Sequence, residues 1–262
     1  MKNLVFVISL KSDEARRQKL KERFKNYGEF RLVEATDGRA MSAKEYYGYA
    51  LASLEAYGRL LSPSEVGCSL SHVRAYKEFL KSDAKFALIL EDDVIGDEDG
   101  VKKAFETAAK MHEGSALICG AQDGLDGRFS AFGKKLEDDF WLVSKRSYGT
   151  IYRAAAYVLD RRAAETVLQT HKKALCVADF WRILLLQNGL KMYFSDIFAH
   201  PTDLTDSNIQ AERVQRAQAK VSLLARLSSL KYVAATRFEA AILGYERIFK
   251  DRKLSDYKAQ NL

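Results

Sequence analysis

Short apolar runs alternate along this chain with polar stretches that carry apolar residues at helical spacing. A run of about five apolar residues between polar flanks is typical of a strand buried on both faces of a sheet. A strand, a helix and a further strand in succession require a parallel pairing. The pattern therefore predicts an α/β fold. The predicted strands cover residues 4–8, 30–35, 86–90, 116–119, 140–143, 151–159 and 191–195.

Residues 62–80 give the clearest helix signal. Ser62 can cap the helix, Pro63 fits its first position, and Glu65 stands three residues after the cap. His72 lies close to the apolar stripe that follows. A histidine there is usually a packing residue, but this one could also reach the edge of the sheet. Further helices are predicted over about residues 13–27, 42–57, 98–111, 161–171 and 175–186, and residues 123–135 are predicted to form a mobile loop.

Three carboxylates, Glu91, Asp92 and Asp93, come together where the predicted strand 86–90 ends. Side chains alternate between the faces of an extended chain, so Glu91 and Asp93 point one way and Asp92 the other. Two like charges this close repel unless a cation lies between them, and Mg²⁺ or Mn²⁺ prefers carboxylate and phosphate oxygens. Ligands of open α/β sheets bind just beyond the carboxyl ends of strands. These residues therefore predict a metal–diphosphate site.

A solvated turn or helix cap is the alternative interpretation of these acids, because the loop-like residues 96–100 follow them. An EF-hand is excluded more firmly, since Ile95 occupies the place of the first calcium-ligating aspartate. Arg16 and Arg17 lie in the first turns of the helix after the first strand. Their guanidinium groups could reach back over the strand end and bind a diphosphate, with an ordinary solvated helix face as the alternative.

Composition narrows the classes of protein. Hydrophobic residues make up 47% of the chain, which argues against global disorder. Three cysteines at wide spacing, without a CxxC pair, argue against a disulfide framework and a zinc ribbon, and for a reducing compartment. The sequence contains no apolar run of membrane-spanning length, and residues 4–10 are too short for a signal peptide. We therefore expect a cytoplasmic protein.

The net charge of +7 is concentrated in residues 210–262, where eleven basic and five acidic residues leave +6. We expect a domain over residues 1–209 and a basic, amphipathic helical segment over residues 210–262. Such a segment is attracted to anionic lipid by about 1 kcal/mol per Lys or Arg near the surface. It predicts either a peripheral contact with the inner leaflet of the inner membrane or a helix pair packed on the domain. Its apolar residues recur on one helical face, at Val214, Ala217, Val221 and Leu224, and continue to Ile248 and Phe249.

Nucleic-acid binding, which the basic pI of about 9.1 alone would suggest, is disfavoured. The positive charge lies in one amphipathic segment, and the sequence contains no RRM, KH or helix–turn–helix pattern with base-reading residues. We expect no nucleic-acid partner.

The motifs, taken in order, resemble those of glycosyltransferase family 25, the bacterial lipooligosaccharide glycosyltransferases. The most specific combination is SEVGCSLSH at residues 64–72 with ALILEDD at residues 87–93. The likeness covers about residues 3–210. Weaker matching pieces are Val7-Ile8-Ser9-Leu10 with Arg16-Arg17, Ala35-Thr36-Asp37-Gly38, Gly149-Thr150, Ala156-Tyr157-Val158-Leu159, Asp179 and Ser207-Asn208-Ile209.

The resemblance implies a GT-A fold, that is, a Rossmann-like α/β domain with a mostly parallel sheet flanked by helices. It also implies transfer of a hexose from a UDP-sugar, with Mn²⁺ or Mg²⁺ and with inversion at the anomeric carbon. Galactose is the family-based choice of sugar, and a lipooligosaccharide or lipopolysaccharide is the implied acceptor. The alternative is a non-catalytic sugar-nucleotide-binding protein of the same fold, against which the intact residues 91–93 and Asp179 argue.

The same resemblance assigns expected roles to single residues. Glu91-Asp92-Asp93 would take the place of the DxD motif, with Asp93 on the metal and Glu91 on the ribose or a metal-bound water. His200 resembles the C-terminal histidine metal ligand of some GT-A enzymes. Asp179 is expected to be the general base, because no other isolated carboxylate falls in a downstream family motif. The expected donor-binding residues are Ser9, Arg17, Asp37, Gly38, His72 and Asp92, and the expected sugar- or acceptor-binding residues are Gly149 and Thr150.

Overall fold

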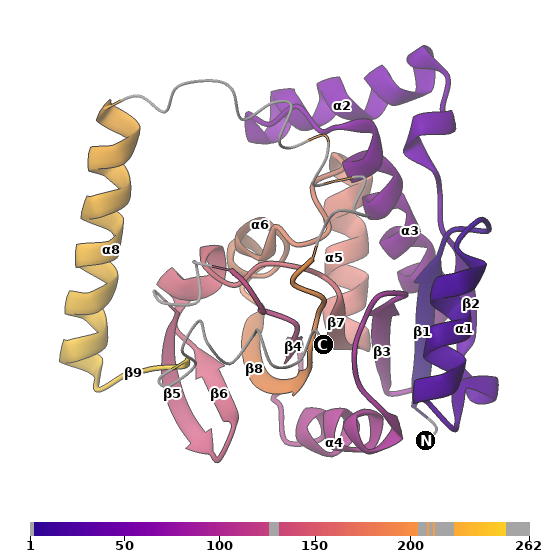
Figure 1. Ribbon diagram of the computed structural model, residues 1–262. Coiled ribbons are helices and arrows are strands. Elements are labelled where there is room, and N and C mark those ends of the chain that lie inside the picture. The colour runs from indigo at the N-terminus through magenta and orange to yellow at the C-terminus, as the bar shows by residue number, and fades with distance from the viewer. Residues whose placement is uncertain (1–2, 126–130, 204–208, 210–211, 213–222, 250–262) are drawn as a thin grey trace.

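The computed structural model describes residues 3–125, 131–203, 209, 212 and 223–249. For residues 223–230 it describes the backbone alone. Within these residues a nine-stranded sheet has the order β2-β1-β3-β7-β4-β8-β6-β5-β9 (Figure 1). Its strands are β1 (Leu4–Ser9), β2 (Arg31–Glu34), β3 (Phe86–Glu91), β4 (Ser115–Gly120), β5 (Phe132–Glu137), β6 (Phe140–Val143), β7 (Ala156–Asp160), β8 (Lys191–Phe198) and β9 (Glu246–Arg247).

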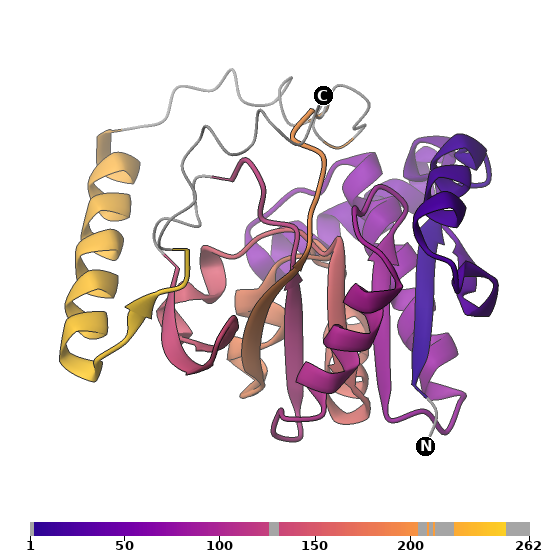
Figure 2. The same cartoon turned by 60° about the horizontal axis from the view of Figure 1, so that its bottom comes forward.

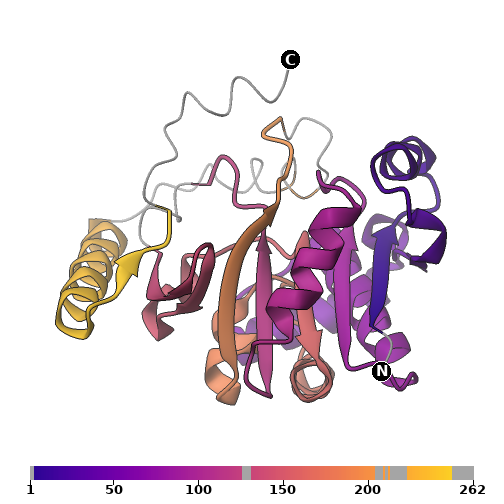
Figure 3. The ribbon, with the colours of Figure 1, turned by 90° about the horizontal axis from the view of Figure 1, so that it is seen from below.

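Helices pack on both faces of this sheet (Figure 3). The α-helices are α1 (Glu14–Arg23), α2 (Ala43–Tyr57), α3 (Pro63–Leu80), α4 (Glu98–Ala108), α5 (Arg161–Lys173), α6 (Trp181–Leu184) and α8 (Leu223–Leu243). The short 3₁₀ helices are η1 (Tyr27–Glu29), η2 (Gly38–Ala40), η4 (Lys145–Gly149) and η5 (Leu186–Asn188).

Most strands of the sheet run in one direction. The pairings orient β2, β1, β3, β4, β8 and β5 alike, and β7, β6 and β9 against them. The parallel pairing of β1 with β3 is the one that the strand–helix–strand series requires. The predicted α/β fold, with a mostly parallel sheet flanked by helices, is confirmed. The antiparallel strand β7 between β3 and β4 is a feature that the sequence pattern did not reveal.

Strand β3 lies between the two hydrophobic cores that the described residues form. Its side chains alternate, so that Leu88 and Leu90 join the core that contains residues of α1 and α4. Ala87 and Ile89 join the opposite core, which contains residues of α3 and α5. All four are fully buried, which explains why this strand is a continuous apolar run. The apolar strand ends where the carboxylates begin.

The loop after β2 is held against the N-terminal part of α3. Helix α3 begins at Pro63 with a capping box between Ser62 and Glu65, as predicted. A Cβ on Gly38 would lie 1.8 Å from the Pro63 carbonyl oxygen, so the two backbones touch and leave no room for a side chain. This contact fixes residues 36–38 beside the carboxyl end of β1.

Several predicted elements differ from the structure, among them the helix predicted over residues 13–27, which ends at Arg23. The strand predicted over residues 151–159 begins only at Ala156, because Arg153 has a left-handed φ of 60° that an extended strand does not allow. The helix predicted over residues 175–186 is reduced to α6, with η5 after it. The loop predicted over residues 123–135 contains the start of β5, which pairs with both β6 and β9. For β5, pairing with neighbouring strands overrides the local pattern.

The C-terminal part combines helix α8 with strand β9, which adds to the far edge of the sheet (Figure 2). Ile248 and Phe249 were predicted on an amphipathic helix, and this is wrong: they follow β9 and are buried in the core. The predicted stripe at Val214, Ala217 and Val221 lies outside the described residues. Among the described helices, none is both long enough and apolar enough to cross a bilayer. The division at residue 210 stays a prediction.

Candidate functional site

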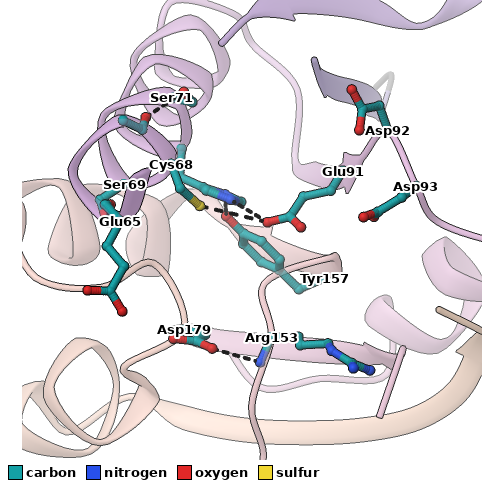
Figure 4. Close-up of polar contacts among 12 residues, drawn as sticks. Glu65, Cys68, Ser69, Ser71, Glu91, Asp92, Asp93, Arg153, Tyr157 and Asp179 are labelled. Carbon is teal, nitrogen blue, oxygen red and sulfur yellow. Dashed lines mark hydrogen bonds and ion pairs between the residues drawn. The ribbon is translucent and has the colours of Figure 1, made fainter. Parts of the chain in front are cut away.

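The carboxyl end of β3 carries the three predicted carboxylates (Figure 4). Glu91 is the last residue of the strand, and its backbone N–H donates to the Ala155 carbonyl at 2.8 Å. The carboxylate groups of Glu91 and Asp93 lie on one side, and that of Asp92 is turned away from them. Asp92 and Asp93 lie in a turn, in which the Val94 N–H donates to the Glu91 carbonyl at 3.3 Å, so this turn orients their carboxylates and not the predicted alternation of an extended chain. Two acids therefore face a common space.

His200 joins Glu91 and Asp93 although more than a hundred positions separate it from them in the sequence. An antiparallel bridge between Ile95 and Ala199 ties the turn after β3 to the end of β8. The result is that one donor atom each of Glu91, Asp93 and His200 lies within 4.8 Å of the others. The structure thus brings together all three residues that the sequence proposed as metal ligands.

These three residues fit a divalent cation. The Nδ1 atom of His200 lies 2.8 Å from the Pro201 carbonyl, so it carries the proton of the neutral ring and leaves Nε2 as the acceptor. That Nε2 atom lies 3.4 Å from Asp93 Oδ1. Asp93 Oδ1 is buried and makes no hydrogen bond within the described residues. A cation would satisfy this oxygen and accept the lone pair of the imidazole.

Burial and nearby charges act on the ionisation of the site. Burial raises the pKa of Asp92 to about 6, and contacts with Ser9 and Arg16 offset part of this effect. Burial acts in the same direction on Asp93, but His200 and Arg16 outweigh it and lower the pKa of that carboxyl. Burial lowers the pKa of His200, and the neighbouring Asp93 outweighs this and raises it. The site therefore holds Asp93 ionised.

A chain of buried hydroxyl and imidazole groups orients Glu91. The hydroxyl groups of Tyr76 and Tyr157 are 2.7 Å apart, and the Tyr157 hydroxyl lies 2.7 Å from His72 Nδ1. His72 Nε2 then lies 3.2 Å from Glu91 Oε1. His72 is fully buried, so it is a packing residue that also reaches the sheet edge. Sequence reasoning left these two roles as alternatives, and the structure combines them.

A cavity of about 500 Å³ opens beside the acids, between the end of β1, the loop after β2, α3 and the end of β3. This volume lies in the range of pockets that hold small molecules and cofactors. Arg16 lines it and contacts Asp92 at 3.1 Å and Asp93 at 3.5 Å. Of the predicted donor-binding residues, those on its wall are Ser9, Asp37, Gly38, His72 and Asp92.

Arg17 is the predicted donor-binding residue that does not line this cavity. Its guanidinium group donates to Ser9 Oγ at 2.9 Å, to the Lys11 carbonyl at 3.0 Å, and to the Leu10 carbonyl. It therefore fastens the chain at the end of β1. Gly149 and Thr150 also lie away from the cavity, at the end of η4, where the Thr150 hydroxyl donates to the Ser147 carbonyl at 2.9 Å.

Asp179 lies in the short segment before α6 and is half-buried. Its Oδ2 atom accepts a hydrogen bond of 3.0 Å from the Arg153 backbone N–H (Figure 4). The Arg153 guanidinium donates to the carbonyls of Ala121 at 3.0 Å and Asp123 at 2.7 Å. Burial lowers the pKa of Arg153, while nearby carboxylates, among them Asp93, Glu91 and Asp179, offset this. Arg153 thus binds Asp179 through its backbone N–H and interacts electrostatically with Glu91 and Asp93.

Sequence reasoning missed Arg153 and Asp123. Asp123 Oδ2 accepts a hydrogen bond of 2.8 Å from the backbone N–H of His200 and so fixes the position of the predicted ligand. Neither residue belongs to a recognisable motif. The one signal in the sequence is the charge of Arg153 inside an otherwise mostly apolar run, which a buried strand would not tolerate.

Comparison with known proteins identifies the family. The model of glycosyltransferase family 25 (LPS biosynthesis protein) matches residues 2–181, so this chain belongs to that family. The resemblance that the motifs at residues 64–72 and 87–93 carry is thereby confirmed.

Relatives with curated names include two procollagen galactosyltransferases. The chain is 32% identical over 96 residues to procollagen galactosyltransferase 2 of Mus musculus, which covers 34% of this chain and 15% of that protein. It is 24% identical over 216 residues to procollagen galactosyltransferase 1 of Danio rerio, covering 73% and 33%. The matched part is therefore a third or less of the length of these relatives.

Similar solved structures include S. aureus TarS 1–349, with a TM-score of 0.44, 14% identity and coverage of 91% of this chain and 72% of that chain. Another is the mannose-1-phosphate geranyltransferase from Thermus thermophilus, with a TM-score of 0.39, 14% identity and coverage of 77% and 75%.

Proposed function

We propose that this protein is a metal-dependent, inverting glycosyltransferase that transfers a hexose, galactose, from a UDP-sugar to a lipooligosaccharide or lipopolysaccharide acceptor. One observation carries the proposal. Glu91, Asp93 and His200 bring their donor atoms within 4.8 Å of one another, and Glu91 and Asp93 line a cavity of about 500 Å³. Family membership and the names of the galactosyltransferase relatives support the class of reaction and the sugar.

The cavity offers groups for each part of a nucleotide donor. Arg16 supplies a guanidinium group that suits a diphosphate, which would replace Asp92 and Asp93 as its partner. Asp37 and Gly38 lie on the wall formed by the loop after β2 and are available to the nucleoside. The Asp37 carboxylate accepts hydrogen bonds from Arg39, which lower its pKa, and is proposed to accept hydrogen bonds from ribose hydroxyl groups as well.

Glu91, Asp93 and His200 would hold Mn²⁺ or Mg²⁺, which as a Lewis acid stabilises the negative charge that develops on a UDP leaving group. The protein contributes the orientation of these ligands. The Pro201 carbonyl fixes the ring of His200 through Nδ1, and the pair of Tyr157 and His72 holds Glu91.

Asp179 is proposed as the general base that takes the proton of the acceptor hydroxyl. Inversion in one step requires a base on the side of the sugar opposite the leaving group. The Arg153 backbone N–H holds Asp179 through Oδ2, which leaves Oδ1 to accept that proton. The Arg153 backbone binds Asp179 and its side chain interacts electrostatically with Glu91 and Asp93, which supports a base near these ligands.

The decisive experiment is a screen of UDP-sugars for hydrolysis and transfer with Mn²⁺, with Mg²⁺ and with excess EDTA. We expect turnover of UDP-galactose that depends on the metal and is abolished by EDTA. Full activity in EDTA contradicts the metal site. UDP binding without turnover of any sugar or acceptor contradicts the enzyme and supports a sugar-nucleotide-binding protein instead.

A lipid-linked acceptor gives the basic C-terminal part a purpose, and we propose that helix α8 contacts the anionic inner leaflet. One face of α8 packs on the domain, where Thr236 and Ala240 are buried and Glu239 pairs with Arg146. The opposite face exposes 69% of Phe238 and 66% of Ile242. Burial of such side chains at a lipid interface is favourable, and Lys and Arg add electrostatic attraction.

Sedimentation with vesicles tests this contact. Wild-type protein is expected to bind vesicles of phosphatidylglycerol and phosphatidylethanolamine but not vesicles of phosphatidylcholine. The double variant Phe238→Ser/Ile242→Ser is expected to lose binding, whereas Leu32→Ser, which removes an exposed leucine on β2, keeps it. Equal binding by both variants contradicts a role for α8.

A further inference from the structure

A second set of potential metal ligands lies next to the candidate metal site described above. One donor atom each of Cys68, His72 and Glu91 lies within 4.8 Å of the others. Cys68 and His72 stand four positions apart on α3, which places them on one face of the helix. Glu91 approaches from the end of β3 (Figure 4). All three line the wall of the cavity, so a cation from solvent can reach them.

The chemistry of these donors differs from that of Glu91, Asp93 and His200. A thiolate and an imidazole are ligands that Zn²⁺ prefers, whereas Mn²⁺ and Mg²⁺ prefer oxygen. Cys68 Sγ lies 3.9 Å and His72 Nε2 3.2 Å from Glu91 Oε1. Ligands of a tetrahedral zinc ion are roughly 3.4–3.6 Å apart, given zinc bonds of about 2.0–2.3 Å. Small side-chain shifts therefore suffice.

The surroundings of His72 suit a ligand. A ligating imidazole usually donates its other ring N–H to a fixed acceptor. His72 Nδ1 lies 2.7 Å from the buried Tyr157 hydroxyl, which is held in turn by Tyr76. This leaves Nε2 directed at Glu91, on the side of the cavity.

We propose that Cys68, His72 and Glu91 form an inhibitory site for Zn²⁺. The Cys68 thiol releases its proton to solvent when zinc binds, and the thiolate, the imidazole and one carboxylate oxygen then hold the ion. Glu91 belongs to both ligand sets. Zinc at Cys68 therefore withdraws Glu91 from the Glu91–Asp93–His200 set and competes with the cation that supports transfer. The competition rests on the proposed function, whereas binding of zinc does not.

Binding of Co²⁺ can detect the site without an activity assay, because Co²⁺ binds at zinc sites and its thiolate complexes absorb in the near ultraviolet. Titration of the wild-type protein with Co²⁺ is expected to give this absorption, and equimolar Zn²⁺ to abolish it. Cys68→Ser is expected to lose the absorption, and Asp93→Asn, which leaves all three zinc ligands in place, to keep it. No absorption in wild type, or unchanged absorption in Cys68→Ser, overturns the proposal.

Alkylation of the wild-type protein gives a second readout that needs no variant. Zn²⁺ is expected to protect Cys68 from iodoacetamide, as measured by mass spectrometry, and equal labelling with and without zinc overturns the site. In transfer assays with Mn²⁺, the zinc concentration that halves the rate is expected to be at least about tenfold higher for Cys68→Ser than for wild type. If Co²⁺ binds through Cys68 but no transfer is found, the proposed function fails and the zinc site stands.

Discussion

Replacing His171 by leucine is expected to make the folded protein less sensitive to acid. His171 lies on α5 and is 6% exposed, and neither ring nitrogen has a hydrogen-bond partner within the described residues. Burial lowers the pKa of its imidazole from 6.5 to about 3. Because the folded-state pKa lies below the unfolded value, protons bind the unfolded chain first. Stability is therefore lost as the pH falls from about 6.5 toward 3.

The size of the effect follows from the two pKa values. Between pH 7 and pH 5 the protonation of the unfolded chain at His171 costs roughly 2 kcal/mol of unfolding free energy. The leucine variant does not lose this unfolding free energy between pH 7 and pH 5. At pH 7 its unfolding free energy is expected to lie within about 1 kcal/mol of the wild-type value, because an apolar side chain replaces an unpaired polar ring. The difference between variant and wild type isolates His171, since other titrating groups are common to both.

Urea unfolding at pH 7 and pH 5, followed by circular dichroism, measures these free energies. His112→Leu is the matched control, because His112 is exposed and its Nδ1 already lies 2.7 Å from the Tyr193 hydroxyl. This control is expected to keep the wild-type difference between the two pH values. A His171→Leu protein that loses as much stability as wild type between pH 7 and pH 5 would refute the reasoning.

Two further predictions concern the fold and the chemistry. Gly38→Ala is expected to destabilise the protein by at least about 2 kcal/mol in urea unfolding, because its Cβ meets the Pro63 carbonyl oxygen at 1.8 Å. Gly48 lies in an exposed turn of α2, and a Cβ there would have no neighbour within 4 Å, so Gly48→Ala is expected to stabilise the protein by about 0.5–1 kcal/mol. Equal changes in stability for the two variants would contradict the close approach of Gly38 to Pro63. Asp179→Asn keeps an acceptor for the Arg153 N–H and is expected to lower kcat by at least about 100-fold with little change in KM for the donor. Asp138→Asn, at a fully exposed carboxylate, is expected to leave kcat unchanged, and a near-wild-type kcat for Asp179→Asn removes it from the role of base.

The parts of the site that local patterns could predict are those where one short stretch determines both the element and its chemistry. The apolar run of β3 that ends at Glu91 is such a case, because burial and the alternation of side chains along the strand act within a few residues. The capping box at Ser62 is another. His200 was predicted as a metal ligand from the family resemblance and not from its neighbours in the sequence.

The parts that could not be predicted depend on contacts between distant segments. Strand β7 runs antiparallel between two parallel strands, and nothing in its own residues marks that place. Arg153 has a left-handed backbone, and its N–H and guanidinium bind groups of distant segments, namely Asp179 and the carbonyls of Ala121 and Asp123. Ile248 and Phe249 pack into the core because β9 pairs with β5. A helical pattern in a single segment contains no information on such pairings.

The most direct test of the central claim is the anomalous diffraction of manganese in crystals grown with MnCl₂ and UDP. The metal site predicts a manganese peak bonded to Glu91, Asp93 and His200, with the diphosphate of UDP completing its shell in the neighbouring cavity. UDP bound elsewhere, or a manganese peak that none of these three residues touches, would contradict the proposed enzyme.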